Sequence, residues 1–228
     1  MRPIILYQGY RMVRRRLHVG LKGFRRLGMD CETICRRSIE RCWNPRGFFM
    51  VAPGHFNLFY ARDFSWCCRH LMELGYEKEV HSTLEYALTR YRRHGRIAVA
   101  IGQNGKPFDF PKEAIDSIPS IIRSLRDAQA YDLIRRFKGF VEDEARRFHN
   151  QFIDSRTGLV RPGHFSSIKD HYKRHSCCYD NCMAAMLSDD LNSLGLENPL
   201  NAYGYQTLLR DTFYTGRFFR EERGTTEV

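Results

Sequence analysis

An arginine–aspartate pair set among aromatic residues is the first feature of the chain that could carry chemistry. The segment at 59–66 reads FYARDFSW. A charged pair of this kind can hydrogen-bond sugar hydroxyls, and the neighbouring rings offer flat surfaces to the C–H face of a pyranose. The structural alternative is a local ion pair whose aromatic neighbours fill the core. The side chains predicted to bind a sugar here are Tyr60, Arg62, Asp63 and Trp66.

A second candidate lies in a loop that precedes a predicted helix. Residues 105–111, GKPFDFP, place a carboxylate between two phenylalanine rings, and Asp116 follows at the expected start of the helix. Long loops on a rigid scaffold often carry functional residues, although a loop that is merely anchored by its phenylalanines would have the same composition. The site candidates from this region are Phe108, Asp109 and Asp116.

The third candidate is the most polar stretch of the chain, from His164 to Cys182. A carboxylate here could be a general acid or bind a sugar hydroxyl. The histidines and cysteines could instead ligate zinc, but the spacing H-x3-H-x-C-C-x3-C matches none of the usual zinc patterns. A cysteine nucleophile with a histidine base is another alternative, although adjacent cysteines on a helix more often serve packing. The site candidates are Asp170, His171 and Asp180.

Apolar residues at helical spacing place the acidic candidates at the starts of helices. Predicted helices begin at or just after Asp63, Asp116 and Asp180, each after a long segment rich in glycine, proline and aromatic residues. A recurrence of roughly fifty to sixty residues indicates stacked αα-hairpins, in which equivalent helix ends lie on the same side. The three aspartates should then gather on one rim. Alternatively, each is an ordinary N-cap, a position that aspartate favours.

The remaining pattern predicts an all-α chain with short β or turn elements in the rim loops. Glycines at 75, 95 and 195 mark helix ends. A β-prone run at 96–101 and turns at 104–105 and 154–159 fall in the longer connections. Predicted helices cover 63–74, 76–91, 116–125, 131–148 and 180–194, with weaker ones at 31–43 and 203–219.

Composition limits the classes of protein to which the chain can belong. Hydrophobic residues make up 43% of its 228 residues, which is enough for a buried core.

We expect a basic N-terminal segment at 1–29 and a helical domain at 30–228. The formal net charge of +11 suggests nucleic acid, but the positive residues are scattered except for a cluster that begins at Arg14–Arg16. A nucleic-acid partner is therefore the least favoured alternative.

Neither a membrane nor an oxidising compartment is indicated. No apolar run is long enough to cross a bilayer, and the apolar stretch at the N-terminus is too short for a secretory signal. The eight cysteines fall in helical patterns, where free cysteine behaves as a small buried hydrophobe. We expect a cytoplasmic protein that needs no disulfide framework.

Three segments resemble the six-hairpin, (α/α)6-toroid glycosidases, which include glucoamylases, trehalases and the glucosidase part of glycogen-debranching enzymes. Residues 60–66, YARDFSW, are similar to their W/Y-x-R-D segment, 114–117 to the start of the next inner helix, and 176–181, SCCYDN, to S-G-W-D-N. The resemblance implies a partial toroid that hydrolyses α-glucosidic bonds with inversion and needs no metal or organic cofactor. It makes Arg62 and Asp63 sugar ligands and Asp180 the general acid, in a pocket lined by Asp109, Asp116, Asp170 and His171.

The sequence also departs from the pattern of that family. Cys178 replaces the glycine of S-G-W-D-N, and His175 stands where a glutamate often precedes it. We count about three and a half of six hairpins, and no residue after Asp180 stands out as the second carboxylate that inversion requires. We therefore expect a second chain or a C-terminal half to complete the barrel. The alternative is a non-catalytic carbohydrate-binding or partner protein of the same fold.

Overall fold

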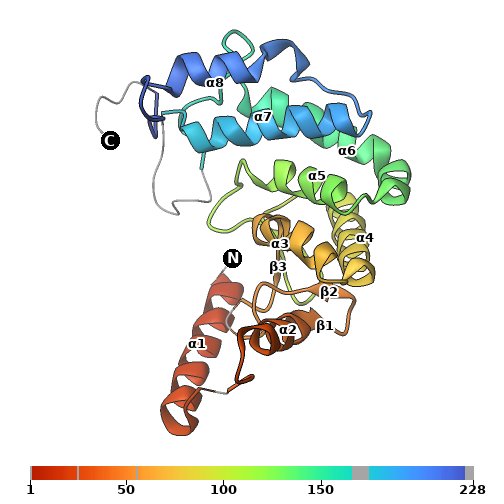
Figure 1. Cartoon of the computed structure of the whole chain (residues 1–228), viewed down its shortest axis with the longest axis vertical. Coiled ribbons are helices and arrows are strands. Elements are labelled where there is room, and N and C mark those ends of the chain that lie inside the picture. The colour runs from red at the N-terminus through yellow and green to blue at the C-terminus, as the bar shows by residue number, and fades with distance from the viewer. Residues whose placement is uncertain (1, 25, 55, 166–174, 224–228) are drawn as a thin grey trace.

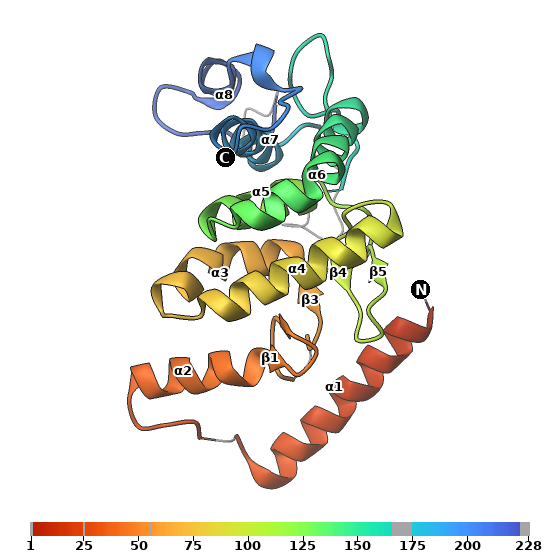
Figure 2. The same ribbon diagram turned by 90° about the vertical axis from the view of Figure 1, so that its right-hand side faces the viewer.

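The structure is a computed structural model that describes residues 2–24, 26–54, 56–165 and 175–223. Helices dominate this part of the chain, so the prediction of a mainly helical fold is confirmed. They follow one another in sequence order from α1 and α2 at one end of the molecule to α7 and α8 at the other (Figures 1 and 2). The helices are α1 (Arg2–Lys22), α2 (Cys31–Cys42), α3 (Ala61–Glu73), α4 (Glu77–His94), α5 (Ser117–Asp127), α6 (Tyr131–Phe152), α7 (Cys178–Ser193), the 3-10 helix η1 (Asn201–Tyr203) and α8 (Tyr205–Phe213).

Each strand in the described residues is two residues long and lies in a connection between helices. β1 pairs with β2, and β3, β4 and β5 form a three-stranded antiparallel sheet beside the start of α3. The sequence predicted the β-prone run that contains β4 and the turn at Gly105, where φ is 76°. It did not predict the other strands. The strands are β1 (Trp43–Asn44), β2 (Phe48–Phe49), β3 (Phe59–Tyr60), β4 (Ala100–Ile101) and β5 (Pro107–Phe108).

Local signals explain several helix boundaries. The N-cap of α2 is Asp30, whose carboxylate accepts a hydrogen bond from the Thr33 N–H at 2.8 Å. α4 ends at Gly95, which takes the left-handed φ of 87° that glycine tolerates best. α8 is shorter than predicted and ends at Phe213, because the chain then reverses through a turn that contains Gly216. α1 occupies most of the basic segment predicted at 1–29.

The apolar faces of the central helices meet in one core. Leu84 and Leu88 of α4, Ile121 and Ile122 of α5, and Phe148 of α6 are all inaccessible to solvent. Burying a side chain of this size contributes roughly 1.5–3 kcal/mol relative to leaving it exposed. No helix in the described part of the chain combines the length and the apolar character needed to cross a bilayer.

Three helices, α3, α5 and α7, lie side by side. α3 contacts α5, and α5 contacts α7. In the C-terminal halves of the first two, the Cys68 thiol donates to the Ser124 carbonyl oxygen at 3.5 Å. At their N-terminal ends, Arg62 lies 3.8 Å from Asp116. Because the N-terminal part of α3 meets that of α5 and the C-terminal halves also meet, the two helices point in the same direction.

A buried carboxylate fixes α7 in the same direction on α5. Asp190, in the last turn of α7, is inaccessible to solvent and accepts hydrogen bonds from Arg123 Nε at 2.7 Å and Arg126 Nη1 at 2.6 Å. At the other end of the two helices, the Tyr179 hydroxyl donates to Asp116 at 3.1 Å. The N-termini of α3, α5 and α7 therefore lie on the same side of the molecule.

An arginine–carboxylate network holds the connection between α4 and α5 against α6. Glu144 of α6 is 2% exposed and accepts a hydrogen bond from the Ile97 N–H at 2.7 Å. Arg147, one turn further along α6, donates to Glu144 at 2.9 Å and also pairs with Glu113 of the connection. The network fixes both ends of the connection that carries β4 and β5 beside the start of α3.

Candidate functional site

The three predicted aspartates all lie where their helices begin. Asp63 and Asp180 are the third residues of α3 and α7, and Asp116 directly precedes α5. The N-cap positions of α3 and α7 are Tyr60 and Cys177, and Asp116 makes no side-chain capping hydrogen bond. The capping explanation is therefore wrong for Asp63 and Asp180, whereas Asp116 occupies the N-cap position of α5 without a side-chain capping hydrogen bond. Their carboxylates still benefit from the partial positive charge of a helix N-terminus.

Arg62 links two of these carboxylates. Its guanidinium lies 3.9 Å from Asp63 and 3.8 Å from Asp116, and its Cζ atom lies 5.5 Å from the centre of the Trp66 ring. The side chains of Arg62 and Asp63 are 24% and 35% exposed, whereas that of Asp116 is 1% exposed. The positive charge offsets the burial of Asp116. It leaves Asp63 and part of the guanidinium accessible to a ligand.

Tyr179 connects α7 to the same group. Its hydroxyl donates to Asp116 Oδ2 at 3.1 Å. Burial raises the pKa of Tyr179 well above its usual value, and the negative charge of Asp116 raises it further. The phenol therefore keeps its proton at neutral pH and remains a donor to Asp116.

Asp180 stands next to this group but is buried. Its side chain is only 2% exposed, and its backbone N–H donates to Cys177 Sγ at 3.4 Å. The charge of Asp180 also contributes to the raised pKa of Tyr179, after burial and Asp116. The acid predicted at position 180 thus belongs to the same region as Asp116 without facing open solvent.

Asn181 holds the start of α7 in place. Its side-chain oxygen accepts a hydrogen bond from the Val160 N–H at 2.9 Å, and its amide donates to Ser176 Oγ at 3.0 Å and to the Cys177 carbonyl oxygen at 2.8 Å. Asn181 is inaccessible to solvent. Its part in the SCCYDN segment is therefore to position Tyr179 and Asp180.

A pocket of about 220 Å³ opens beside Arg62 and Asp63. We call it the Arg62 pocket. Charged groups from α3 and the start of α5 form one part of its lining, and aromatic rings from the preceding connections form another. Its lining residues are Val51, Phe56, Tyr60, Arg62, Asp63, Val99, Phe110, Asp116 and Ser117.

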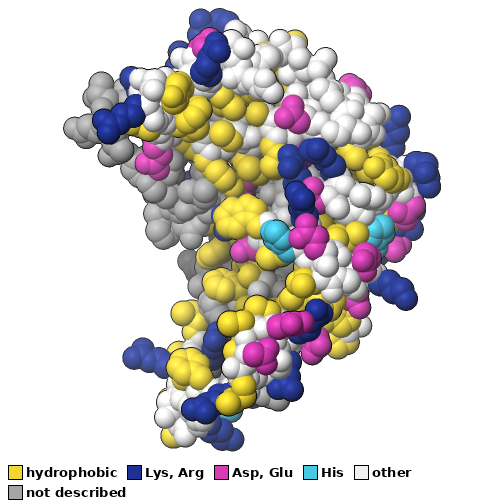
Figure 3. All heavy atoms as spheres, viewed as in Figure 1, with side chains coloured by type: hydrophobic (Ala, Val, Ile, Leu, Met, Phe, Trp, Pro, Cys, Tyr) yellow, Lys and Arg dark blue, Asp and Glu magenta, His cyan; other side chains and the backbone are white. Residues whose placement is uncertain are grey.

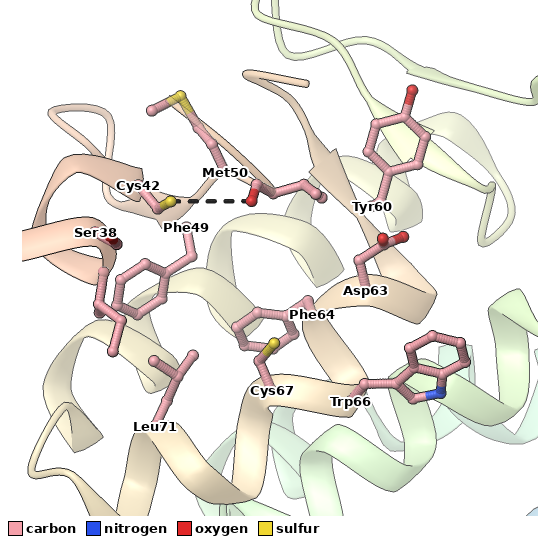
Figure 4. A pocket seen from close by; sticks show the side chains of 12 residues that line it. Ser38, Cys42, Phe49, Met50, Tyr60, Asp63, Phe64, Trp66, Cys67 and Leu71 are labelled. Carbon is pink, nitrogen blue, oxygen red and sulfur yellow. Dashed lines mark hydrogen bonds between the residues drawn. The ribbon is translucent and has the colours of Figure 1, made fainter. Parts of the chain in front are cut away.

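A second and more apolar pocket of about 330 Å³ lies between α2, β2 and α3 (Figure 4). We call it the Cys67 pocket. It shares Val51, Tyr60 and Asp63 with the Arg62 pocket, so the two adjoin at these residues. Its lining residues are Ser38, Ile39, Cys42, Phe49, Met50, Val51, Tyr60, Asp63, Phe64, Trp66, Cys67 and Leu71.

Phe108, Asp109 and Trp66, which the sequence also predicted as site residues, do not line the Arg62 pocket. Phe108 packs against a small apolar cluster that Tyr60 also contacts. Asp109 pairs with Arg96 and accepts a hydrogen bond from the Val99 N–H at 3.1 Å, so it supports the connection. Trp66 lies under the Arg62 guanidinium and lines the Cys67 pocket. The two other predicted residues, Asp170 and His171, lie outside the described residues.

The structure adds residues that sequence reasoning did not select. Phe56 and Phe110 line the Arg62 pocket, and Tyr179 binds Asp116. Phe110 is the second ring of the FDFP segment, and Tyr179 directly precedes the predicted acid. The position of an aromatic residue next to a candidate carboxylate could therefore have identified both Phe110 and Tyr179 from the sequence. Phe56 lies in a connection whose path no local pattern revealed.

Neither metal binding nor thiol chemistry gains support from the described part of the chain. No three His, Cys, Asp or Glu side chains there gather as metal ligands. Burial, together with Cys182, whose sulfur lies 3.9 Å away, raises the pKa of the Cys178 thiol to about 12. Because the thiolate is the nucleophile, a thiol held neutral in this way is poorly suited to nucleophilic catalysis.

Comparison with protein-family models, with curated proteins and with solved structures finds no match to this chain. The case for its function therefore depends on the residues and geometry of the two pockets.

Proposed function

We propose that the protein is a glycoside hydrolase-like protein that binds a carbohydrate in the Arg62 pocket and acts on α-glucosidic linkages. The observation that carries the proposal is the placement of Arg62 between Asp63 and Asp116 in a pocket with aromatic walls. Guanidinium N–H groups donate to sugar hydroxyls, and the Asp63 carboxylate accepts from them. The rings of Phe56, Tyr60 and Phe110 offer apolar surfaces to the C–H groups of the sugar.

For the reaction we propose inverting hydrolysis with Asp180 as the proton donor. Its support is its position next to Tyr179, whose hydroxyl reaches Asp116 of the Arg62 pocket. Inversion needs a second carboxylate about 6.5–9.5 Å from the first, with a water between them. We propose that another chain supplies this second carboxylate and completes the barrel.

The arrangement of helices supports a fold of stacked αα-hairpins. α3, α5 and α7 form a contacting, parallel series, and α4 and α6 each contact the helix that precedes or follows them. We propose that these helices are the inner and outer layers of a partial (α/α)6 toroid. The N-termini of the inner helices would then surround the substrate.

A second candidate function is non-catalytic carbohydrate binding. It is favoured by the burial of Asp180, which is 2% exposed and is not among the residues that line the Arg62 pocket. A proton donor must reach the glycosidic oxygen, whereas a sugar-binding protein needs only Arg62, Asp63 and the aromatic rings.

Nucleic-acid binding ranks below both. On the face drawn in Figure 3, lysine and arginine side chains are dispersed among acidic, apolar and uncharged ones. Affinity for DNA or RNA that falls steeply between two salt concentrations would favour nucleic-acid binding.

A cytoplasmic location remains part of the proposal, and its support is that the eight cysteines form no disulfide.

The binding test uses calorimetric titration with maltose, trehalose and maltooligosaccharides. Arg62→Ala should weaken the binding of whichever sugar binds by at least about tenfold, because a hydrogen bond to a charged group contributes roughly 1.5–3 kcal/mol. Arg69→Ala is the matched control, since Arg69 lies two turns further along α3 and pairs with exposed Glu73. Equal affinities in the two variants would refute the assignment of the Arg62 pocket.

The catalytic test measures glucose release from the same sugars. Asp180→Asn should abolish the release while sugar binding persists. Full activity in Asp180→Asn would refute the assigned acid. Binding without any release in the native chain would favour the non-catalytic function.

A further inference from the structure

The Cys67 pocket is chemically unlike the Arg62 pocket that it adjoins. Phe49, Phe64 and Leu71 form much of its wall (Figure 4). The pocket has a volume of about 330 Å³. That volume falls within the range of roughly 300–1,000 Å³ typical of pockets that bind small molecules. A ligand for this space must therefore be largely apolar.

The end of the pocket nearest α2 presents no charge. The Cys42 thiol donates to the Val51 carbonyl oxygen at 3.9 Å, and the Ser38 hydroxyl donates to the Ile34 carbonyl oxygen at 2.7 Å. Burial raises the pKa of both Cys42 and Cys67, so both thiols are neutral at physiological pH. These groups line the pocket without offering a charged partner to a ligand.

The opposite end of the pocket is polar. Figure 4 shows Asp63 and Tyr60 on the side away from Phe49 and Leu71. Asp63 also lines the Arg62 pocket and lies 3.9 Å from Arg62. A single ligand that extended past Asp63 would meet charged hydrogen-bonding groups on one side and apolar walls on the other.

The packing of α2 explains why this space exists. No residue of α2 is fully buried, although Ile39 and Cys42 face the pocket. The helix is therefore held near α3 without closing the gap between them. Filling that gap with an apolar group would remove apolar surface from water on both the protein and the ligand, which is favourable.

We infer that the ligand of this site is amphiphilic: a sugar held in the Arg62 pocket and joined to an alkyl or aryl group that fills the Cys67 pocket. The inference rests on the proposed function, because it assigns the sugar to the Arg62 pocket. It narrows the substrate class from oligosaccharides in general to glycosides whose other half is apolar. Asp63, which lines both pockets, stands at the junction of the two halves.

The test compares three compounds by calorimetric titration of the full chain, below the concentration at which any of them forms micelles. They are methyl α-D-glucoside, octyl α-D-glucoside and 1-octanol. The octyl glycoside should bind at least about tenfold more tightly than the methyl glycoside, since burial of even two methylene groups corresponds to that gain. Saturating 1-octanol should abolish this advantage and leave the binding of methyl glucoside unchanged.

A cavity-filling variant locates the apolar group. Cys67→Phe places a ring in the pocket and should reduce the affinity for octyl glucoside to that for methyl glucoside. Cys35→Phe is the matched control, because Cys35 is exposed and does not line the pocket. An advantage of octyl glucoside that persists in Cys67→Phe would overturn the inference. The competition with 1-octanol needs no variant and decides the question even if Cys67→Phe does not fold.

The results that would overturn the amphiphilic ligand differ from those that would refute sugar binding. Equal affinities for the methyl and octyl glycosides would overturn the inference and leave sugar binding standing. Binding of 1-octanol with no binding of either glycoside would refute sugar binding, and the amphiphilic ligand with it.

Discussion

Replacement of Asp190 by asparagine tests the contact that aligns α7 with α5. The carboxylate is inaccessible to solvent and accepts two hydrogen bonds, from Arg123 at 2.7 Å and Arg126 at 2.6 Å. Asparagine has nearly the same shape but no charge, and its NH2 group, which replaces one carboxylate oxygen, cannot accept a hydrogen bond. The variant therefore removes one of the two acceptors and the charge on the other.

The expected loss follows from the exposure of the partners. Removing one member of a buried ion pair usually costs roughly 3–5 kcal/mol, because it leaves a buried charge uncompensated. The Arg123 and Arg126 side chains are 29% and 42% exposed, so water can partly replace the lost acceptor. We therefore expect the low end, about 3 kcal/mol. For a chain of 228 residues this corresponds to a fall of roughly 6–12 °C in Tm.

Urea denaturation followed by circular dichroism measures this difference in the free energy of unfolding. Asp189→Asn is the matched control, because it makes the same chemical change at an exposed neighbour and should cost less than about 0.5 kcal/mol. A loss in Asp190→Asn no greater than in Asp189→Asn would show that the two ion pairs do not stabilise the fold. Retention of sugar binding in the folded variant would show that the site does not depend on this clamp.

Three further predictions concern the residues around the site. Tyr179→Phe should lower the free energy of unfolding by roughly 1–2 kcal/mol in urea denaturation, because it removes the hydroxyl that donates to buried Asp116. Asn181→Ala should cost about 2–3 kcal/mol in the same measurement, since it leaves the buried Val160 N–H without its acceptor. For Glu113, burial alone would raise the pKa, but hydrogen bonds from its neighbours outweigh burial and lower it below 4.5. A carboxyl whose pKa is lower in the folded than in the unfolded state stabilises the fold above its unfolded pKa, and this contribution is lost as pH falls through the folded pKa. The free energy of unfolding should therefore fall less steeply between about pH 5 and pH 3 in Glu113→Gln than in the native chain.

Controls for these predictions come from exposed positions on the same helices or in similar pairs. Cys182→Ala on α7 should be nearly neutral, unlike Asn181→Ala. Glu85→Gln, which alters an exposed pair with Arg136, should leave the pH dependence close to that of the native chain. A larger effect at either control than at its counterpart would contradict the assigned role.

Sequence patterns located most of the helices because their signals are local. The spacing of Leu84 and Leu88 and the glycine at position 95 define α4, and the isoleucines at 121 and 122 identify α5. The recurrence of aspartates at helix starts also predicted that Asp63 and Asp116 would lie on one side. Arg62 within 4 Å of both is consistent with that prediction.

The loop residues could not be assigned in the same way. Asp109 lies between two phenylalanines, as a ligand-binding carboxylate might be expected to, yet it pairs with Arg96 across the base of the connection. Phe56 reaches the Arg62 pocket from a segment without regular periodicity. Such contacts depend on the path of the loop, and residue spacing does not encode it.

The sequence alone determined which residues lie together on one helix face and, to within about two residues, where the helices after α1 begin, because those features depend on neighbours within a few positions. It did not predict α1. Tertiary structure decided the relations between helices. The positions of α3, α5 and α7 relative to one another place Arg62 within reach of Asp116, bring Tyr179 to the same carboxylate and bury Asp180, the residue after Tyr179. These relative positions of the helices depend on long-range contacts such as the pairing of Asp190 with Arg123. Residues so far apart in the chain share no local sequence pattern that would predict such a contact.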